Sequence, residues 1–169
     1  SKTPLMILKN LNKNFLINVF LISLIFLLDR ISKIYVINLN HKLLGSEIFS
    51  SNYLNISLIW NEGIAFGLFS FSQTIMYDLL TLFISLVIIV ILIMLIKSND
   101  LRKYPLLMIF GGAIGNLYDR VFYKAVPDFI DVHVNNFHWF IFNVADIFIS
   151  IGVISMILIE IIGNKRKHD

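Results

Sequence analysis

Four long runs of apolar residues dominate the pattern of the chain. They cover about residues 15–37, 74–96, 104–122 and 140–162, and each is long enough to cross roughly 30 Å of hydrocarbon as a helix. The first and third runs carry charge near their C-terminal ends and the fourth near its start, whereas the second is apolar throughout. The pattern predicts four membrane-spanning helices.

Basic residues form three clusters that indicate the orientation of these helices. Because such residues accumulate in cytoplasmic loops, four spans place all three clusters and both termini in the cytoplasm. No small-residue cleavage site follows the first run, so we expect an uncleaved helix rather than a secretory signal. The clusters are Lys2, Lys9 and Lys13, then Lys97, Arg102 and Lys103, and finally Lys165, Arg166 and Lys167.

The two remaining connections, about residues 38–73 and 123–139, are expected to face outward. Residues 53–60 largely alternate polar with apolar side chains, Asn61-Glu62-Gly63 indicates a turn, and residues 64–71 return as a second strand or a re-entrant piece. The sequence therefore predicts an all-α membrane protein, a single integral domain over residues 1–169. Its four transmembrane helices carry a small β-sheet, about residues 48–70, on the periplasmic membrane surface.

The composition supports a membrane location. Hydrophobic residues make up 57% of the chain and charged residues 15%, more apolar surface than a soluble core of this size can bury. The net charge of +3 lies at the ends of the apolar runs, which suits membrane orientation better than nucleic-acid binding. Cysteine is absent, which excludes a thiol nucleophile, disulfides and cysteine-based metal sites.

Three of the predicted helices place a carboxylate at a similar depth. Counting ~1.5 Å per residue from their cytoplasmic ends puts Asp29, Asp119 and Asp146 at roughly 21–24 Å, in the outer third of the bilayer. Asp128, in the second outer connection, can fold back over that level. Acids at this depth cost ~3 to ~10 kcal/mol and require an explanation. Two acids that share a proton could activate water and protonate a leaving group, as in an aspartic hydrolase.

Several of these polar groups also have purely structural interpretations. Asp29 and Lys33 are four residues apart on a helix and could neutralise each other. Asp119 is followed by Arg120 and preceded by Asn116, a combination that could satisfy an ion at depth.

The fourth helix and the helix before it carry packing and capping signals. Gly111 and Gly115 form a small-xxx-small pair, which predicts a close helix-packing face. Asn143 could cap the fourth helix, and Asp146 in its first turn would favour the helix dipole.

A metal site is not expected. His133 and His138 are five residues apart, no H-E-x-x-H motif is present, and His41 and His168 are isolated. Asp131 is expected to point to water or to a turn.

Five short motifs follow one another along nearly the whole chain. They are Asp29-Arg30-Ile31-Ser32-Lys33, Asn61-Glu62-Gly63-Ile64-Ala65-Phe66, Gly115-Asn116-Leu117-Tyr118-Asp119-Arg120, Val126-Pro127-Asp128-Phe129 and Phe142-Asn143-Val144-Ala145-Asp146. At these spacings the set resembles the lipoprotein signal peptidases (signal peptidase II), four-span aspartic peptidases of bacterial inner membranes. The chain departs from the family at Arg30, where Gln is common.

The resemblance implies that Asp128 and Asp146 form the catalytic pair, whereas depth alone would pair Asp119 with Asp146. Arg120 is expected to hold Asp119 ionised, which makes that acid unsuited to sharing a proton. The implied supporting and substrate-binding residues are Asp29, Lys33, Asn61, Gly63, Asn116, Asp119, Arg120 and Asn143.

The resemblance also implies the reaction. The expected enzyme is an intramembrane aspartic endopeptidase that removes signal peptides from diacylglyceryl-modified prolipoproteins, cleaving just before the lipidated cysteine. It needs no metal or organic cofactor, and globomycin-type peptide antibiotics should block it. We expect a monomer in the bacterial inner (cytoplasmic) membrane that contacts membrane lipid and no nucleic acid, with its active site near the periplasmic face.

Two other classes of protein place acids in membranes. A small proton-coupled transporter or channel would do so, but repeat-related halves and broken helices are not visible in the sequence. A non-catalytic assembly factor could use the polar residues only to hold helices together. Replacing Asp128 or Asp146 by Asn separates these classes, because only a peptidase would stay folded and lose cleavage.

Overall fold

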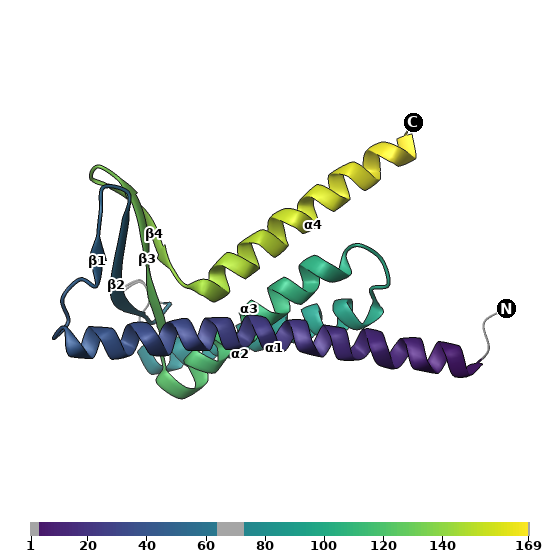
Figure 1. Cartoon of the computed structure of the whole chain (residues 1–169), viewed down its shortest axis with the longest axis horizontal. Helices are drawn as coiled ribbons and strands as arrows, with labels where there is room; N and C mark the ends of the chain where they lie inside the picture. The colour runs from purple at the N-terminus through teal and green to yellow at the C-terminus, as the bar shows by residue number, and fades with distance from the viewer. Residues whose placement is uncertain (1–3, 64–72, 169) are drawn as a thin grey trace.

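A computed structural model describes residues 4–63 and 73–168 (Figure 1). Among these residues, two strands follow the first helix, and two more strands precede the last helix. The elements are α1 (Pro4–Lys42), β1 (Phe49–Ser50), β2 (Leu54–Asn61), α2 (Gln73–Lys97), α3 (Lys103–Tyr123), β3 (Val126–Val134), β4 (Phe137–Phe142) and α4 (Val144–His168).

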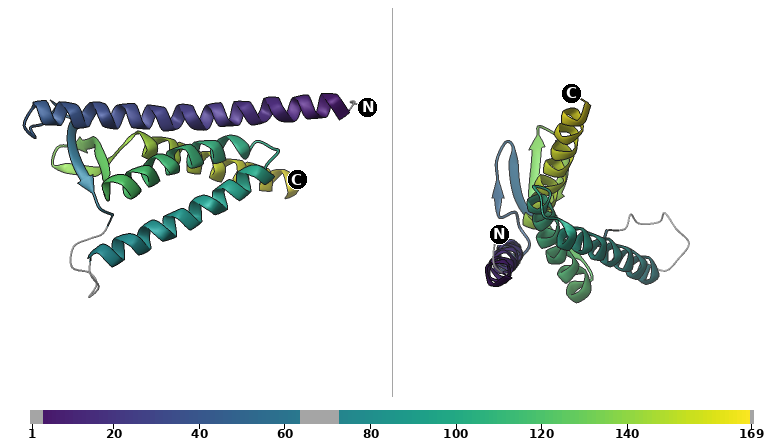
Figure 2. Two further views of the ribbon diagram at one scale, coloured as in Figure 1. Left: turned by 90° about the horizontal axis from the view of Figure 1, so that it is seen from below. Right: turned by 90° about the vertical axis from the view of Figure 1, so that its right-hand side faces the viewer.

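Helix α3 lies at the centre of the helical part, and α1, α2 and α4 each pack against it (Figure 2). The sheet stands at one end of the molecule. The N-terminus, the C-terminus and the connection between α2 and α3 lie toward the opposite end (Figure 1). The four helices therefore run alternately toward the sheet and away from it.

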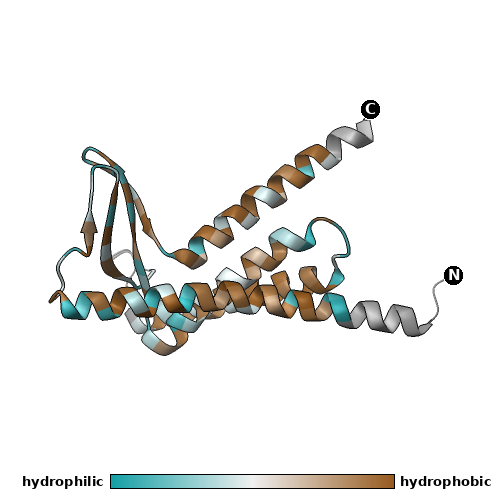
Figure 3. Ribbon diagram, in the orientation of Figure 1, coloured by the Kyte–Doolittle hydropathy of each residue, from teal (hydrophilic) through white to brown (hydrophobic). Residues whose placement is uncertain are grey.

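Three of the described helices are long and apolar enough to cross a membrane: Lys13–Lys42 within α1, Thr74–Lys97 within α2 and Val144–Gly163 within α4. Helix α3 is not among them, because its glycines and the polar group Asn116, Asp119 and Arg120 make it less apolar. Figure 3 shows hydrophobic colour along the middle of α1 and along most of α4, and polar colour in the connection between α2 and α3 and toward the sheet end of α1. The crossing of α3, and hence a count of four spans, stays a prediction.

The helix ends differ from the sequence-based ranges mainly at α4. Helices α2 and α3 begin and end within one residue of 74–96 and 104–122, and α1 extends beyond 15–37 at both ends. The range 140–162 was wrong at its start. Residues 140–142 belong to β4, where pairing with β3 takes priority over their apolar character, and the helix begins only at Val144.

The sheet is antiparallel with the strand order β1-β2-β3-β4, and it joins the connection between α1 and α2 to the connection between α3 and α4. Strand β2 pairs with β3, with Leu54 opposite Val132 and Asn61 opposite Val126. The sequence analysis confined the sheet to residues 48–70, which was wrong because β3 and β4 supply half of its strands. The second strand expected at residues 64–71 lies outside the described residues.

Polar side chains are buried and apolar side chains are exposed in the helical part, which is the opposite of the arrangement in a soluble protein. The largest fully buried side chains in the described part of the chain are those of Lys33, Asn143, Asp29, Asp119 and Pro127, while many Leu, Ile and Phe side chains of the helices are exposed. This distribution fits a protein whose apolar exterior faces lipid.

The polar interior depends on close helix packing. A Cβ atom at Gly111 would lie 3.0 Å from Ile25, and one at Gly115 would lie 2.6 Å from Oδ2 of Asp29. The packing face predicted from these two glycines is therefore confirmed, and it lies against α1.

Candidate active site

The N-terminus of α4 is held by a reciprocal pair of hydrogen bonds. The backbone N–H of Asp146 donates to Oδ1 of Asn143 (3.0 Å), and the backbone N–H of Asn143 donates to Oδ2 of Asp146 (3.1 Å). This is the geometry of a capping box, with an amide at the cap and an acid three residues later. The predicted cap at Asn143 is confirmed, and it fixes the position of the Asp146 carboxylate.

Asn143 also holds Asp128, so one residue contacts both acids. Its Nδ2 donates to Oδ1 of Asp128 (2.6 Å), and Nδ2 of Asn61 donates to Oδ2 of the same carboxyl (2.9 Å). Asn61 is itself oriented, because its Oδ1 accepts the N–H of Gly63 (2.8 Å), which has a φ of +74°. Strands β2 and β3 and the start of α4 thus bring Asp128 beside Asp146.

The surroundings of Asp128 favour its protonated form. Burial raises the pKa of this carboxyl, and the nearby negative charge of Asp146 raises it further. The hydrogen bonds from Asn61 and Asn143, and the charge of Lys33, oppose this shift without reversing it. A carboxyl of this kind can keep a proton more readily than an exposed aspartate.

A second group of buried charges lies between α1 and α3. Nζ of Lys33 donates to Oδ2 of Asp29 (2.8 Å), Oδ1 of Asn116 (2.9 Å) and Oδ2 of Asp119 (2.6 Å), which uses all three of its N–H donors. Nη2 of Arg30 lies 2.6 Å from Oδ1 of Asp119. Two cations therefore balance two carboxylates in this cluster.

Arg30, and not Arg120, is the arginine that neutralises Asp119. The expectation from sequence was wrong because adjacent residues on a helix do not face each other. Nη1 of Arg120 lies 3.4 Å from the backbone oxygen of Asn116, and its buried Nε has no hydrogen-bond partner among the described residues. The Arg30 guanidinium also lies over the ring of Tyr118, 4.8 Å from its centroid.

Two contacts connect the charge cluster with the pair of acids. Nδ2 of Asn116 donates to Oδ1 of Asp146 (2.8 Å), and the backbone N–H of Ala145 donates to Oδ1 of Asp29 (3.0 Å). The second contact places the Asp29 carboxylate at the N-terminus of α4, where the helix dipole favours a negative charge. Every site residue predicted from sequence thus lies in one region where the helices meet the sheet, although Arg120 plays a different part there from the one expected.

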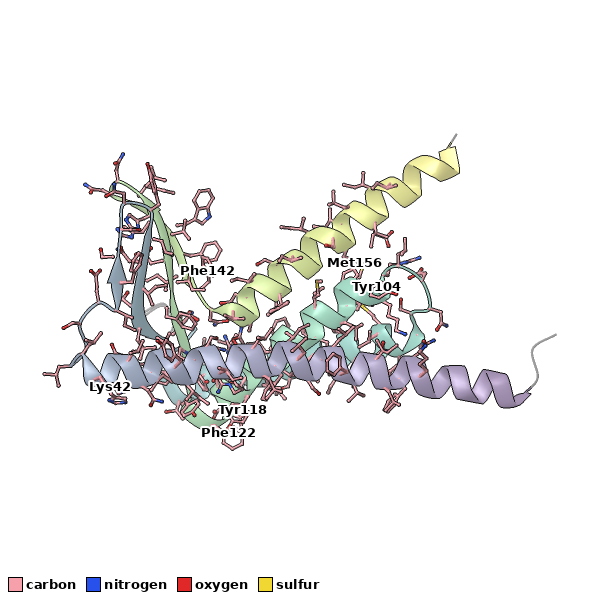
Figure 4. All side chains as sticks on the ribbon, in the orientation of Figure 1. Lys42, Tyr104, Tyr118, Phe122, Phe142 and Met156 are labelled. Atoms are coloured by element: carbon pink, nitrogen blue, oxygen red, sulfur yellow. The ribbon has the colours of Figure 1, made fainter. Side chains whose placement is uncertain are left out.

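An apolar cavity of about 230 Å³ lies beside Asp146, between α4 and β4. Figure 4 shows Phe142, one of its lining residues, at the point where β4 passes into α4. The other lining residues are Phe140, Ile147, Ser150, Ile151 and Ile154. The carboxylate of Asp146 therefore borders a space suited to an apolar chain.

Asp131 lies elsewhere in the sheet. It was expected to point to water or to a turn, but it is buried and its carboxylate lies 2.8 Å from Nδ1 of His138. The expectation failed because the partner comes from β4, which the sequence analysis did not predict.

Known proteins resemble the chain over most of its length. The family model described as signal peptidase (SPase) II matches residues 21–162. The lipoprotein signal peptidase of Pelagibacter ubique (strain HTCC1062) is 48% identical over 155 residues, which cover 92% of this chain and 93% of that protein. The lipoprotein signal peptidase of Anaplasma marginale (strain Florida) is 36% identical over 156 residues, covering 91% of this chain and 89% of that protein.

Two solved structures, both described as bacterial membrane enzymes studied by the in meso method, share the fold. One, at 1.9 Å resolution, has a TM-score of 0.65 and 30% identity, and the match covers 85% of this chain and 91% of that one. The other, at 2.3 Å, has a TM-score of 0.64 and 26% identity, with coverages of 90% and 91%. By sequence and by fold, this membrane protein belongs to the signal peptidase (SPase) II family of peptidases.

Proposed function

We propose that the chain is an intramembrane aspartic endopeptidase that removes signal peptides from diacylglyceryl-modified prolipoproteins, cleaving just before the lipidated cysteine. The observation that carries this proposal is the pairing of Asp128 and Asp146 around Asn143. Within residues 4–63 and 73–168, neither acid forms an ion pair. Two neighbouring acids, Asp128 buried and Asp146 partly buried, that are held only by amide groups are suited to sharing one proton.

The reaction follows from that shared proton. In this scheme Asp128 carries it at the start, since burial raises the pKa of this carboxyl, and Asp146 acts as the base. Asp146 takes a proton from a water molecule, which attacks the scissile carbonyl carbon, while Asp128 donates its proton to the carbonyl oxygen. The proton on Asp146 then passes to the nitrogen of the leaving amine. As the carbon–nitrogen bond breaks, one hydroxyl of the tetrahedral intermediate returns its proton to Asp128, so the products are a carboxylic acid and an amine and both acids regain their starting states.

The charge cluster supports the pair without entering the chemistry. Because Arg30 and Lys33 balance Asp29 and Asp119, the acid pair is left as the uncompensated negative charge among the buried and partly buried site residues that the structure describes. Lys33 also holds Asn116, whose amide then faces Asp146. No metal or organic cofactor is required by this scheme.

The substrate would reach the pair from the membrane. The cavity beside Asp146 is lined largely by apolar side chains and can take part of a lipidated peptide. The names of the curated relatives, lipoprotein signal peptidases, support the same substrate class. Globomycin-type peptides would compete for this space.

The proposed setting is the bacterial inner membrane, where the protein acts as a monomer that contacts lipid and no nucleic acid. Both termini lie at the end away from the sheet, so cytoplasmic termini put the sheet and the active site near the periplasmic face (Figure 1). This arrangement includes a crossing by α3, which the packing of α1, α2 and α4 around it supports.

Replacement of Asp128 or Asp146 by Asn tests the proposal. Each variant should lose roughly 10²- to 10⁴-fold in cleavage of a diacylglyceryl precursor, the usual effect of removing a general acid or base, and still fold and insert. Asp78→Asn, at an exposed site on α2, is the matched control and should cleave normally. Cleavage is measured by the mobility shift of the precursor in a gel.

Two outcomes would contradict parts of the proposal. Full activity in Asp128→Asn or Asp146→Asn would rule out a mechanism that uses both carboxyl groups. Processing of an unlipidated precursor at the same rate as the lipidated one would remove the proposed substrate class and leave the mechanism standing.

A further inference from the structure

We propose that the hairpin of β3 and β4 binds one divalent transition-metal ion through Asp131, His133 and His138. The site is separate from the pair of acids, and the ion has no part in peptide cleavage. The proposal stands independently of the proposed function.

The strand register brings the three side chains to one face of the sheet. Asp131 and His133 are two residues apart on β3 and therefore point to the same side. His138 on β4 is the direct cross-strand neighbour of His133. One ligand atom from each residue can be chosen so that all three lie within 4.8 Å of one another. The spacing along the sequence hides this arrangement, because it arises only when the hairpin closes.

Contacts within the cluster already resemble those of a metal site. Nδ1 of His138 lies 2.8 Å from Oδ2 and 3.1 Å from Oδ1 of Asp131, close to the separation of about 3 Å between two donors on one zinc ion. The rings of His133 and His138 are stacked, with centroids 4.9 Å apart and planes inclined by 24°. An ion can replace the proton between His138 and Asp131 with small side-chain rotations.

His133 supplies a second, independent indication of a ligand. Its side chain is buried, with 9% of the residue exposed, and its Nδ1 has no hydrogen-bond partner in the described part of the chain. A buried polar atom without a partner costs about 1–3 kcal/mol, so such atoms call for an explanation. An ion held by the cluster would give this buried imidazole a polar partner.

The chemistry of the donors selects the class of ion. Two imidazoles and one carboxylate suit Zn²⁺, Ni²⁺ or Cu²⁺ rather than Mg²⁺ or Ca²⁺, which prefer oxygen ligands. The side chain of His138 is 53% exposed, which leaves water access for the remaining coordination position. The acid and the two imidazoles lie in the sheet, outside the apolar helical segments.

A bound ion would join the two strands that frame the candidate active site. Strand β3 carries Asp128, three residues before Asp131, and β4 leads directly into the cap residue Asn143. An ion fixed to both strands would therefore stabilise the hairpin by binding only the folded state. We assign the ion a structural role of this kind.

The test is metal titration of the full-length protein in detergent micelles, purified without a polyhistidine tag and stripped with a chelator. Co²⁺ is followed by its visible absorption, and Zn²⁺ by competition and by metal content. The wild type should bind one equivalent, and Zn²⁺ should raise its thermal unfolding temperature. His138→Ala and Asp131→Asn should each weaken binding at least about tenfold and abolish the thermal shift.

His41→Ala is the matched control, because His41 is an exposed histidine at the end of α1, away from the hairpin. It should bind Zn²⁺ as the wild type does. His133→Ala is a further test, but replacement of this buried residue could unfold the sheet. The metal affinity of His138→Ala, at an exposed position, is therefore the deciding measurement. Equal affinity in His138→Ala and the wild type, or binding by the wild type with no thermal shift, would overturn the proposal.

Discussion

Two pairs of aspartates lie side by side in this protein, and their partners are of different kinds. Asp29 and Asp119 are bound by the cations Lys33 and Arg30, whereas Asp128 is bound by the amides of Asn61 and Asn143. A cation beside a carboxylate compensates its charge, and the hydrogen bonds from Lys33 to Asp29 and Asp119 hold the first pair in a fixed arrangement.

Amide partners have the opposite consequence. They hold a carboxyl in place without adding positive charge, and burial then favours the protonated form. Asp146 is held in the same manner, by the side-chain amide of Asn116 and the backbone N–H of Asn143. The same residue type therefore serves as a structural ion in one pair and as a candidate acid or base in the other, and the neighbours decide which.

Removal of the shared cation should have the largest effect on stability. Lys33→Met leaves Asp29 and Asp119 with too little compensating charge, and breaking a buried ion pair in this way costs about 3–5 kcal/mol in the free energy of unfolding. Lys42→Met, at the exposed end of α1, is the control and should change stability little. Denaturant unfolding in micelles measures both. Equal stability of the two variants would mean that Lys33 does not hold the cluster together.

A methyl group placed against the cation-held pair should have the next largest effect. Gly115→Ala would bring Cβ to 2.6 Å from Oδ2 of Asp29, and overpacking of this kind costs about 1–3 kcal/mol. Gly163→Ala, which has no heavy atom within 4 Å of its new Cβ, should be neutral or stabilising by up to about 1 kcal/mol. Thermal unfolding compares the two variants. A Gly115→Ala protein as stable as the wild type would show that α1 and α3 can move apart without loss of stability.

Two replacements of Asn143 should separate its capping role from its contact with Asp128. Asn143→Ala loses both, whereas Asn143→Ser keeps a good cap, so the Ala variant should be less stable than the Ser variant by about 1 kcal/mol. Both variants lose the amide donor to Asp128, which becomes charged when it gives up its proton, and a hydrogen bond to a charged group is worth about 1.5–3 kcal/mol. Cleavage should therefore fall roughly ten- to hundredfold in both. Normal cleavage by Asn143→Ser would show that this amide is dispensable.

The pH dependence of stability should give the smallest effect. Since the pKa of Asp128 is raised in the folded state, the stability that its neutral form contributes is complete below the ordinary value of 3.8 and is lost as pH rises through the folded pKa. Relative to Asp128→Asn, the wild type should therefore become less stable as pH rises, by at most about 1.4 kcal/mol per pH unit. Denaturant unfolding of the wild type and of Asp128→Asn, from pH values below 3.8 upward, measures the difference in their stability. A wild type that gains stability relative to the variant would mean that the pKa is lowered.

The sequence by itself determined the local features of the fold. Long apolar runs specify helices because lipid requires backbone hydrogen bonds to be satisfied within the segment. The cap formed by Asn143 and Asp146 depends on residues three apart, and the glycine face of α3 on residues four apart, so both could be predicted. The motifs of the family also located the polar residues of the candidate site along the chain, but not the apolar residues that line the cavity beside Asp146.

Only the tertiary structure decided which distant residues meet. Asn61 reaches Asp128 from 67 positions away because β2 pairs with β3, and the polar alternation of residues 131–134 became informative only within that sheet. The choice of Arg30 over Arg120 for Asp119 depends on the packing of α1 against α3. Such contacts follow from the register and rotation of elements that are remote in sequence, and local periodicity carries no information about either.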